Sequence, residues 1–411
     1  MIGNILGEKS SGWALRVLIL VIWVLVGRVQ EIIPGLSYLY LGKVVLGLAA
    51  IVYLFTPWLP GAAQFSYSQL RYLVYLFGLG LISTLQSFWP GGSFSFMMFG
   101  FLSPLFMVFL LLKVIVTYGE LRKVFWSIMA FLLLLGGAAL FFTEEGRISA
   151  SATYDPNDLA LIITIFFPLM YYFMINSQGG ERLLLMGANL FLIVTMLATQ
   201  SRSGFIAFCV VTILILIRER VNTGRILLGG IVVVMVFCFY APTAFLERLQ
   251  VVGSEDDYNM SAGGGRIEVW KRGLGLITEH PFLGVGPNAF PIAEGSKHID
   301  QETGTTGKWS AAHNSYIQIA SEFGIPGFIL YMTVLITTIR SLRSAREKLP
   351  EESEFRWVIN GLELSFYGFM TGGFFLSQAY SSALFLIIGL SVAVQILSQN
   401  SQPPEELTRC P

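Results

Sequence analysis

Apolar runs long enough to cross a lipid bilayer recur along this 411-residue chain, and they constrain its fold more than any other feature. A helix needs about 20 mainly apolar residues to cross the hydrocarbon core of a membrane. Hydrophobic residues make up 54% of the sequence and charged residues only 13%, whereas soluble domains have about 25% charged residues. The sequence therefore predicts an all-α polytopic membrane protein.

The apolar runs predict about twelve transmembrane helices. They lie near residues 13–33, 35–57, 69–88, 93–117, 121–142, 158–176, 183–199, 203–217, 225–241, 314–340, 357–376 and 380–397. No convincing cleavage site follows the first run, so we expect it to stay as a membrane helix. The chain then divides into three parts: residues 1–241 with helices 1–9, residues 242–312 as a long helical extracytoplasmic loop, and residues 313–411 with helices 10–12 and a cytoplasmic tail.

Lysine and arginine in the short loops set the orientation, because cytoplasmic loops carry an excess of these residues. If the N-terminus is cytoplasmic, most cations of the short loops collect on that side, from Lys9 near the start to Arg409 near the end. The opposite loops hold few cations apart from Arg28, Arg147, Arg202 and those of the long loop. Both termini are therefore expected in the cytoplasm, with the long loop outside.

Polar residues return to the outer side of this topology at four places. These polar islands are residues 143–158, residues 200–203, the long loop and residues 377–382. Because the chain returns each time to the same surface with hydrogen-bonding side chains, we expect a shared cavity at the outer leaflet.

A polar stripe begins where the long loop ends. His313 lies at the boundary between water and hydrocarbon, and Asn314, Gln318 and Glu322 recur every four residues, so they share one face of a helix. A glutamate inside an apolar segment is costly unless it faces protein or a wet cavity. The stripe is therefore either an intramembrane site or a polar seam that attaches this helix to its neighbour.

Two other islands also have both a structural and a functional interpretation. Asp155 precedes a proline, and Asn157 or Asp158 then fits the cap of an ordinary helix start. Arg202 lies in a turn between apolar segments, where an arginine either extends to the membrane interface or binds an anion.

Inside the long loop, glycines at 263–265 precede Arg266 and an amphipathic helix. Free backbone N–H groups at a helix start favour an anion, and a guanidinium offers a planar fork suited to phosphate oxygens. Glycine-rich turns precede many helices, so this signal alone is weak. His280 in a later turn is interpreted as structural, and His298 as a solvated surface residue.

Neither a metal nor another cofactor is expected. The three histidines lack ligand-type spacing, and the acidic run at 255–257 fits a solvated loop tip better than a cation site. Cys209, Cys238 and Cys410 fit neither a disulfide framework nor a zinc site. A net charge of zero gives no indication of nucleic-acid binding.

Five motifs follow one another along the chain. They are Tyr154 to Ala160, Gln200 to Gly204, Gly265-Arg266 followed by Trp270, His280 to Gly286, and His313 to Tyr316 with Glu322 and Gly327. In order and spacing they resemble the bacterial O-antigen ligase and O-antigen polymerase superfamily. The resemblance covers about residues 140 to 397, while the first 120 residues contribute only generic apolar spans.

The resemblance implies transfer of a glycan from undecaprenyl diphosphate to an acceptor sugar hydroxyl, at the periplasmic face of the bacterial inner membrane. The acceptor is lipid A-core in a ligase and another lipid-linked repeat in a polymerase. Such proteins resemble inverting, metal-independent glycosyltransferases. By position, His313 matches the family's essential histidine, and Arg202 and Arg266 match its essential arginines.

The chemistry agrees with these roles. Breaking a glycosyl–phosphate bond develops negative charge on the departing diphosphate, which two arginines in a low-dielectric pocket would stabilise. Histidine side chains titrate near neutral pH and suit a general base. We expect His313 to act as the base or to orient the acceptor, and Arg202 and Arg266 to clamp the diphosphate. Secondary candidates are Asn314, Tyr316, Glu322, Asp155, Gln378 and Tyr380; the polyprenyl tail needs an apolar groove, for which residues 101–109 are one option.

Three alternatives stay open. The same chemistry fits an O-antigen or exopolysaccharide polymerase, and the superfamily also includes ligases that attach glycans to protein. A flippase or secondary transporter is a different class, for which inverted repeats with broken helices are typical. No such repeat is visible at matching positions of the two halves, so we favour the O-antigen ligase.

Overall fold

The computed structural model describes residues 12–33, 35–36, 40–57, 67–141, 143–144, 147–148, 150, 154–220, 265–297 and 309–400. The helices before residue 220 are α1 (Gly12–Leu25), α2 (Val29–Ile32), α3 (Leu41–Phe55), α4 (Ser68–Thr84), α5 (Pro90–Ser95), the π-helix η3 (Phe96–Phe101), α6 (Leu102–Val114), α7 (Tyr118–Ala139), α8 (Pro156–Ile175), α9 (Gly179–Ala198) and α10 (Arg202–Arg218). The later helices are α13 (Arg266–Glu279), α14 (Phe290–Lys297), α15 (Ser315–Lys348), α16 (Glu354–Gly373) and α17 (Ser382–Asn400). Apart from the antiparallel pair β1 (Thr143–Glu144) and β2 (Arg147–Ile148), the regular structure of the described residues is helical, which confirms the all-α class.

Six membrane-spanning candidates are present among the described residues, by length and apolar composition. They are the continuous run from α5 through η3 to α6, and the helices α7, α8, α9, α15 and α17. Every expected span overlaps a helix except residues 225–241, which lie outside the described residues. Of the long loop, residues 265–297 and 309–312 are described, and they contain α13 and α14.

The expected span at 13–33 was too long. The helix α1 ends at Leu25, and Arg28 then adopts a left-handed conformation with φ of 48°. That conformation is incompatible with a continuing right-handed helix. A four-residue helix, α2, follows the break.

The helix α15 is kinked where the sequence contains Gly324 and Pro326. Gly324 has φ of 69°, and an added Cβ would lie 2.6 Å from the carbonyl carbon of Phe282, so only glycine fits. The kink frees the N–H of Ile325 from the helix, and this group donates to the carbonyl of Pro281 at 2.8 Å. The turn after α13 is thereby attached to the middle of α15.

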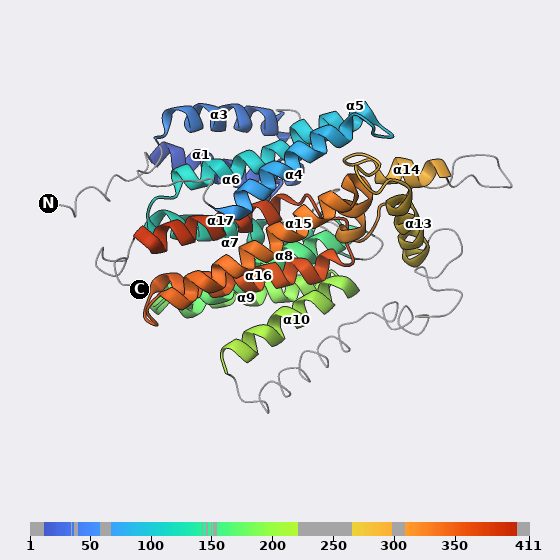
Figure 1. Cartoon of the computed structure of the whole chain (residues 1–411). Coiled ribbons are helices and arrows are strands. Elements are labelled where there is room, and N and C mark those ends of the chain that lie inside the picture. Colours follow the sequence, from blue (N-terminus) through green and yellow to red (C-terminus); the bar gives the residue numbers. More distant parts are fainter. Residues whose placement is uncertain are drawn as a thin grey trace.

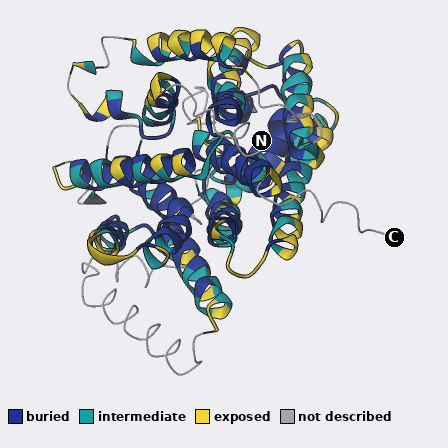
Figure 2. Cartoon of the chain, turned by 90° about the vertical axis from the view of Figure 1, so that its left-hand side faces the viewer, coloured by how far each residue is buried: buried dark blue, intermediate teal, exposed yellow. Residues whose placement is uncertain are grey.

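The centre of the bundle is formed by α8, α16 and α17. In the most apolar 18-residue stretches of α8 and α17, 78% and 89% of the residues are buried. The corresponding stretch of α9 is only 33% buried, so α9 lies on the outside of the bundle. Glycines let α16 approach its neighbours: an added Cβ at Gly361 would lie 2.8 Å from Leu169 Cα, and one at Gly372 would lie 2.2 Å from Leu161 Cδ1. Small residues allow such close helix packing in membranes. Figure 2 shows the buried residues concentrated inside the bundle.

The two ends of the bundle differ in what they carry. Figure 1 shows α13 and α14 gathered at one end, beside the start of α15, while the connection from α15 to α16 lies at the other end. Hydrogen bonds described below join the starts of α8, α10 and α15 at the first of these ends. Three of the expected polar islands therefore contribute residues to one end of the protein.

Candidate functional site

The island before α8 is fixed by two side chains that precede the helix. Asp155 is the N-cap, and its Oδ1 accepts hydrogen bonds from the backbone N–H groups of Asn157 at 2.7 Å and Asp158 at 2.8 Å. The cap is thus Asp155 and not Asn157 or Asp158, because Pro156 occupies the first helical position, where its missing N–H costs nothing. Asp155 therefore serves as the helix cap. The side chains of Asn157 and Asp158 are then available for hydrogen bonds with residues distant in sequence.

Tyr154 attaches the same island to the end of α1. Its hydroxyl donates to the carbonyl of Val26 at 2.5 Å, and the guanidinium of Arg28 lies over its ring, 5.1 Å from the centroid. Burial raises the pKa of the Tyr154 phenol, so it stays a protonated donor at neutral pH. Arg28, one of the few cations expected on the outer side, is held here by an aromatic ring.

The start of α10 lies directly against the start of α8. Ser201 is the N-cap of α10: its Oγ accepts from the N–H of Gly204 at 3.1 Å and donates to Oδ1 of Asn157 at 2.8 Å. An added Cβ at Gly204 would lie 2.3 Å from Cβ of Ala160, so the two helices approach more closely here than a side chain would allow. Arg202, the first residue of α10, is thereby placed next to Asn157 and its helix.

Arg266 is the first residue of α13, and Gly265 occupies the cap position without a side-chain hydrogen bond. One turn later, the indole Nε1 of Trp270 donates to the carbonyl of Ala312 at 3.0 Å. An added Cβ at Gly273 would lie 2.5 Å from Cγ2 of Ile317, so α13 packs tightly on α15. The helix that begins with Arg266 is thus fixed to the residue immediately before His313.

His313 lies at the entry to α15 in a left-handed conformation with φ of 47°. Its backbone N–H donates to Oγ of Ser377 at 2.7 Å. Asn314 is the N-cap of α15, and its Oδ1 accepts from the N–H groups of Tyr316 at 2.9 Å and Ile317 at 3.1 Å. The Tyr316 hydroxyl donates to the carbonyl of Met370 at 2.8 Å, so the secondary candidates Asn314 and Tyr316 both hold the entry to α15.

The connection between α16 and α17 forms hydrogen bonds with the starts of both α15 and α8. The hydroxyl of Ser315 donates to the carbonyl of Leu376 at 2.6 Å and accepts from the N–H of Gln378 at 2.9 Å. Nε2 of Gln378 donates to Oδ1 of Asp158 at 2.8 Å, across 220 positions of sequence. Side-chain hydrogen bonds therefore join the islands at 143–158, 200–203 and 377–382 to one another and to the entry of α15.

The polar stripe of α15 is used in contacts with protein groups. Oε1 of Gln318 accepts from the N–H of Ala379 at 3.3 Å. The buried carboxylate of Glu322 accepts from the Tyr380 hydroxyl at 2.5 Å, the N–H of Asn288 at 2.9 Å and the N–H of Phe290 at 3.3 Å. These contacts favour the polar seam over an intramembrane site, since they join α15 to the connection before α17 and to the turn before α14.

A hollow of about 500 Å³ lies near the Tyr380–Glu322 pair. It is lined by Trp89, Gly91, Gly92, Ser95, Phe96, Phe99, Gly100 and Asn288. The ring of Phe96 lies 5.0 Å from that of Tyr380 between centroids, and Asn288 is the residue whose N–H binds Glu322. Phe101, at the start of the expected lipid groove, is buried against Tyr380 and Phe385 instead of facing outward.

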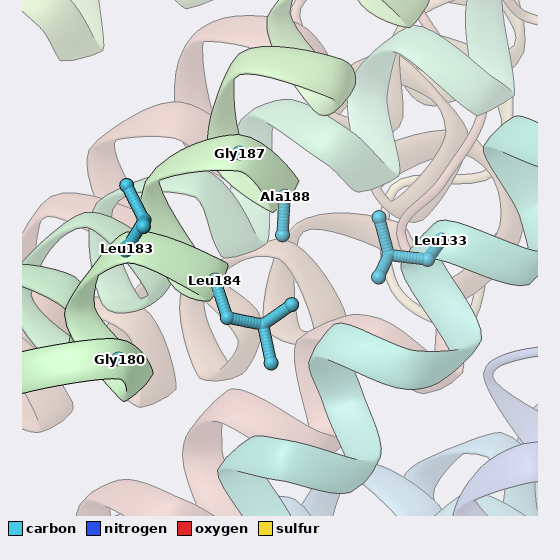
Figure 3. Close-up of a pocket in the computed structure, with 6 residues that line it drawn as sticks. All are labelled: Leu133, Gly180, Leu183, Leu184, Gly187 and Ala188. Carbon is cyan, nitrogen blue, oxygen red and sulfur yellow. The ribbon is translucent and has the colours of Figure 1, made fainter.

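A second hollow, of about 480 Å³, lies between α7 and α9. Figure 3 shows Leu133 of α7 and Leu184 of α9 pointing toward one another across it. The remaining lining residues are Gly180, Leu183, Gly187 and Ala188. Its lining is apolar and includes none of the candidate site residues.

Two of the candidate cations lie at positions that favour binding of an anion. Arg202 and Arg266 each open a helix, where the positive end of the helix dipole and the first N–H groups add to the charge of the guanidinium. His313 follows the residue that Trp270 holds. Among the described residues, no three His, Cys, Asp or Glu side chains are grouped as metal ligands would be.

Several residues that hold this site were not singled out from the sequence. Ser377, Trp270 and Ser201 each bind the backbone or a neighbour of a candidate residue. Ser377 and Ser201 lie inside expected polar islands, and Trp270 belongs to one of the five motifs, so their region was predictable. Their partners were not, because hydrogen bonds over 42 to 64 positions leave no periodic signal in the sequence.

Comparison with known proteins agrees with the motifs. Residues 187–332 match the family model described as O-Antigen ligase. This segment is similar to the O-antigen ligase family. It contains Arg202, Arg266 and His313, whereas Asp155, Gln378 and Tyr380 lie outside the matched residues. The expected resemblance to the O-antigen ligase and polymerase superfamily is confirmed.

Two relatives match about half of the chain. A ComP-specific O-oligosaccharyltransferase of Acinetobacter baylyi is 23% identical over 215 residues, which are 51% of this chain and 38% of that protein. An uncharacterized protein of Haemophilus influenzae is 23% identical over 236 residues, which are 53% of this chain and 59% of that protein. The match therefore spans less than two thirds of either relative's length.

Proposed function

We propose that this protein is a membrane glycosyltransferase that moves a glycan from undecaprenyl diphosphate to a hydroxyl of an acceptor sugar, as an O-antigen ligase with lipid A-core as acceptor. The family match supports the class of reaction. The observation that carries the proposal is the set of hydrogen bonds that joins the turn of Arg202, the start of α8 and the entry at His313. Arg202 and His313, 111 positions apart in sequence, then serve one substrate.

In the proposed reaction, the acceptor hydroxyl oxygen attacks the anomeric carbon of the donor glycan. The bond between that carbon and the phosphate oxygen breaks, and its electron pair leaves with the diphosphate. His313 takes the hydroxyl proton, and Arg202 and Arg266 bind the phosphate oxygens as their charge grows. Attack from the face opposite the leaving group inverts the anomeric centre. The guanidinium groups carry the charge compensation, so the proposed mechanism uses no divalent ion.

The distribution of cations supports an orientation. Arg218 lies in the last turn of α10, and Arg343, Arg346 and Lys348 lie in the last two turns of α15. These are the opposite ends of the two helices from Arg202 and His313. By the excess of cations in cytoplasmic loops, that end is the cytoplasmic one. The proposed site then faces the periplasm, in the bacterial inner membrane, where a lipid-linked glycan and lipid A-core can both reach it.

The test is glycan transfer in proteoliposomes that contain the full-length protein, a polyprenyl-diphosphate-linked glycan and lipid A-core. We expect His313→Ala to abolish transfer while donor binding persists, because only the proton acceptor is lost. His280→Ala is the matched control, since His280 contacts the ring of Phe88 and takes no part in the proposed reaction. Full transfer by His313→Ala would exclude the base role.

The diphosphate clamp has a separate readout. We expect Arg202→Ala and Arg266→Ala to weaken donor binding and to lower the maximal rate, because each loses a charge-assisted contact with the leaving group. Lys271→Ala, on the exposed face of α13 with Glu268 as its partner, is the control for loss of one cation. Donor affinity equal to that of the control in both arginine variants would exclude the clamp.

A protein acceptor is the second candidate. The relative in Acinetobacter baylyi is named for transfer of an oligosaccharide and for specificity toward ComP. The catalytic residues would be unchanged, and only the acceptor would differ. Glycan found on a protein, with lipid A-core left unmodified, would favour this candidate over the ligase.

An O-antigen polymerase is distinguished in cells. Deletion of a ligase leaves long lipid-linked chains without attachment, whereas deletion of a polymerase leaves single repeats on the acceptor. Movement of lipid-linked glycan across the membrane with no new glycosidic bond would instead indicate a flippase.

A further inference from the structure

Three arginines converge on one buried carboxylate, at a distance from the candidate site. Glu363 of α16 has a side chain with 0% exposure. Its Oε2 accepts from Nη2 of Arg218 and from Nη1 of Arg346, each at 2.8 Å, and its Oε1 accepts from Nε of Arg343 at 2.6 Å. We call Arg218, Arg343 and Arg346 the arginine cluster. It bridges α10 and α15 across α16.

The arginine cluster carries more positive charge than its partner neutralises. Three guanidinium groups face one carboxylate, and within the described residues none of them forms an ion pair with another acidic group. The other contacts are neutral: Arg218 and Arg346 reach Asn360, and Arg343 donates to the hydroxyl of Tyr367. The local charge is therefore +2 on the carboxylate and guanidinium groups alone.

The cluster keeps hydrogen-bond donors that are not used by the described residues. Each guanidinium has five N–H groups, and Nε of Arg218 and of Arg346 donates to no other described residue. The side chain of Arg343 is 51% exposed, and those of Arg218 and Arg346 are 21% and 22% exposed. An anion can reach these donors from outside while Glu363 holds the guanidinium groups in place.

The position of the arginine cluster in the bundle indicates which kind of anion would bind to it. Arg218 ends α10, which begins with Arg202, so a 17-residue helix of about 1.5 Å per residue separates the two by roughly 24 Å. In the last two turns of α10, Ile213 and Ile217 are exposed, and Ile336, two turns before Arg343 in α15, is exposed as well. Exposed apolar side chains beside basic groups at the end of a membrane bundle match a lipid, with its chains along the isoleucines and its headgroup at the arginines.

We propose that the arginine cluster binds the phosphate group of an anionic phospholipid. Arginine suits this role because its planar fork binds two phosphate oxygens at once. Glu363 keeps the three guanidinium groups together despite their mutual repulsion, and the lipid phosphate compensates the remaining charge. This site is independent of the glycan-transfer site and would exist in this chain whatever its reaction.

The experiment compares the thermal unfolding of the full-length protein in nanodiscs of phosphatidylcholine with that in nanodiscs containing increasing phosphatidylglycerol. We expect phosphatidylglycerol to raise the midpoint in the wild type. Arg343→Gln should weaken the apparent affinity for this lipid about fivefold, because one basic residue at an anionic surface is worth about 1 kcal/mol. The matched control is Arg340→Gln, one turn away on the same helix and exposed. An equal loss in both variants would indicate general surface attraction and would overturn the proposal.

A second variant separates binding from structural support. Glu363→Gln removes the carboxylate but keeps three cations, so we expect a lower midpoint in phosphatidylcholine and a larger gain from phosphatidylglycerol than in the wild type, because the lipid phosphate then compensates more charge. A network with only a structural role predicts the same loss in both lipids, which would also overturn the proposal. Inorganic phosphate added to phosphatidylcholine nanodiscs tests a soluble anion. A gain of the same size from phosphate alone, lost in Arg343→Gln, would reject the lipid as the ligand.

Discussion

The backbone N–H of His313 donates a 2.7 Å hydrogen bond to the hydroxyl of Ser377, 64 positions later in the chain. His313 has φ of 47°, a conformation that few residues other than glycine adopt. On the next turn, Ser315 binds the carbonyl of Leu376 and the N–H of Gln378. The connection between α16 and α17 therefore holds the proposed base in a conformation that it would rarely adopt by itself.

We expect Ser377→Ala to lower the rate of glycan transfer by roughly tenfold or more. The substitution leaves the N–H of His313 without its acceptor, at a cost of about 1–3 kcal/mol, and 1.36 kcal/mol at the transition state corresponds to about tenfold in rate. The measurement is the initial rate in proteoliposomes, with thermal unfolding to show that the bundle is retained. Thr333→Ala is the control, because among the described residues this hydroxyl of α15 donates only to the carbonyl of Ile329 in its own helix. Equal rates in the two variants would exclude an orienting role for Ser377.

The helices could be predicted from the sequence because apolar runs and caps are local signals. The expected spans coincide with helices wherever the structure describes them. The extent of the first span was wrong, since a left-handed residue at Arg28 leaves no apolar or polar signature. The cap of α8 was misplaced for a similar reason: Asp155, Asn157 and Asp158 all suit a cap, and the position of Pro156 decides among them.

The gathering of polar islands could be predicted, whereas their contacts could not. Charge asymmetry between loops predicted that the islands lie on one side of the membrane. Hydrogen bonds such as that between Gln378 and Asp158 join three of them. The partners of Glu322 illustrate the limit. Two of them are backbone N–H groups, of Asn288 and Phe290, and every residue except proline carries such a group. The sequence therefore left open whether Glu322 serves substrate or fold.

We expect Trp270→Phe to raise the KM for the donor by about fivefold while the unfolding midpoint stays within a few degrees. The substitution removes the indole N–H that binds the carbonyl of Ala312, but it keeps a ring against Phe374, whose centroid lies 5.5 Å away. Loss of one such hydrogen bond costs about 0.5–1.5 kcal/mol, and here the loss separates the helix of Arg266 from His313. Trp309→Phe is the control, because Trp309 is exposed and packs near Gly295. An unchanged KM would show that this contact does not position the donor site.

We expect Glu322→Gln to destabilise the protein by about 2 kcal/mol and Tyr380→Phe by about 1 kcal/mol. A glutamine can present its –NH₂ to the N–H of Asn288 or Phe290, so two donors would face each other, whereas the phenylalanine removes only the 2.5 Å bond. The double variant should lose less than the sum, because both changes break the same contact. Denaturant unfolding of the four proteins measures the coupling. Strict additivity would show that Glu322 and Tyr380 do not stabilise one another.

The close approach of α8 and α10 at Gly204 predicts that a larger residue there destabilises the protein. An added Cβ at Gly204 would lie 2.3 Å from Cβ of Ala160, so Gly204→Ala must push the start of α10 away from α8. Overpacking of this kind costs about 1–3 kcal/mol.

Gly187→Ala in α9 is the matched control, because nothing lies within 4 Å of an added Cβ there, and alanine in a helix gains about 1 kcal/mol over glycine. Thermal unfolding should therefore move in opposite directions for the two variants. Since Arg202 follows directly on Ser201, whose hydroxyl binds Asn157, Gly204→Ala should also weaken donor binding, and Gly187→Ala should not. If Gly204→Ala leaves both the midpoint and donor binding unchanged, the packing of α10 on α8 does not place Arg202.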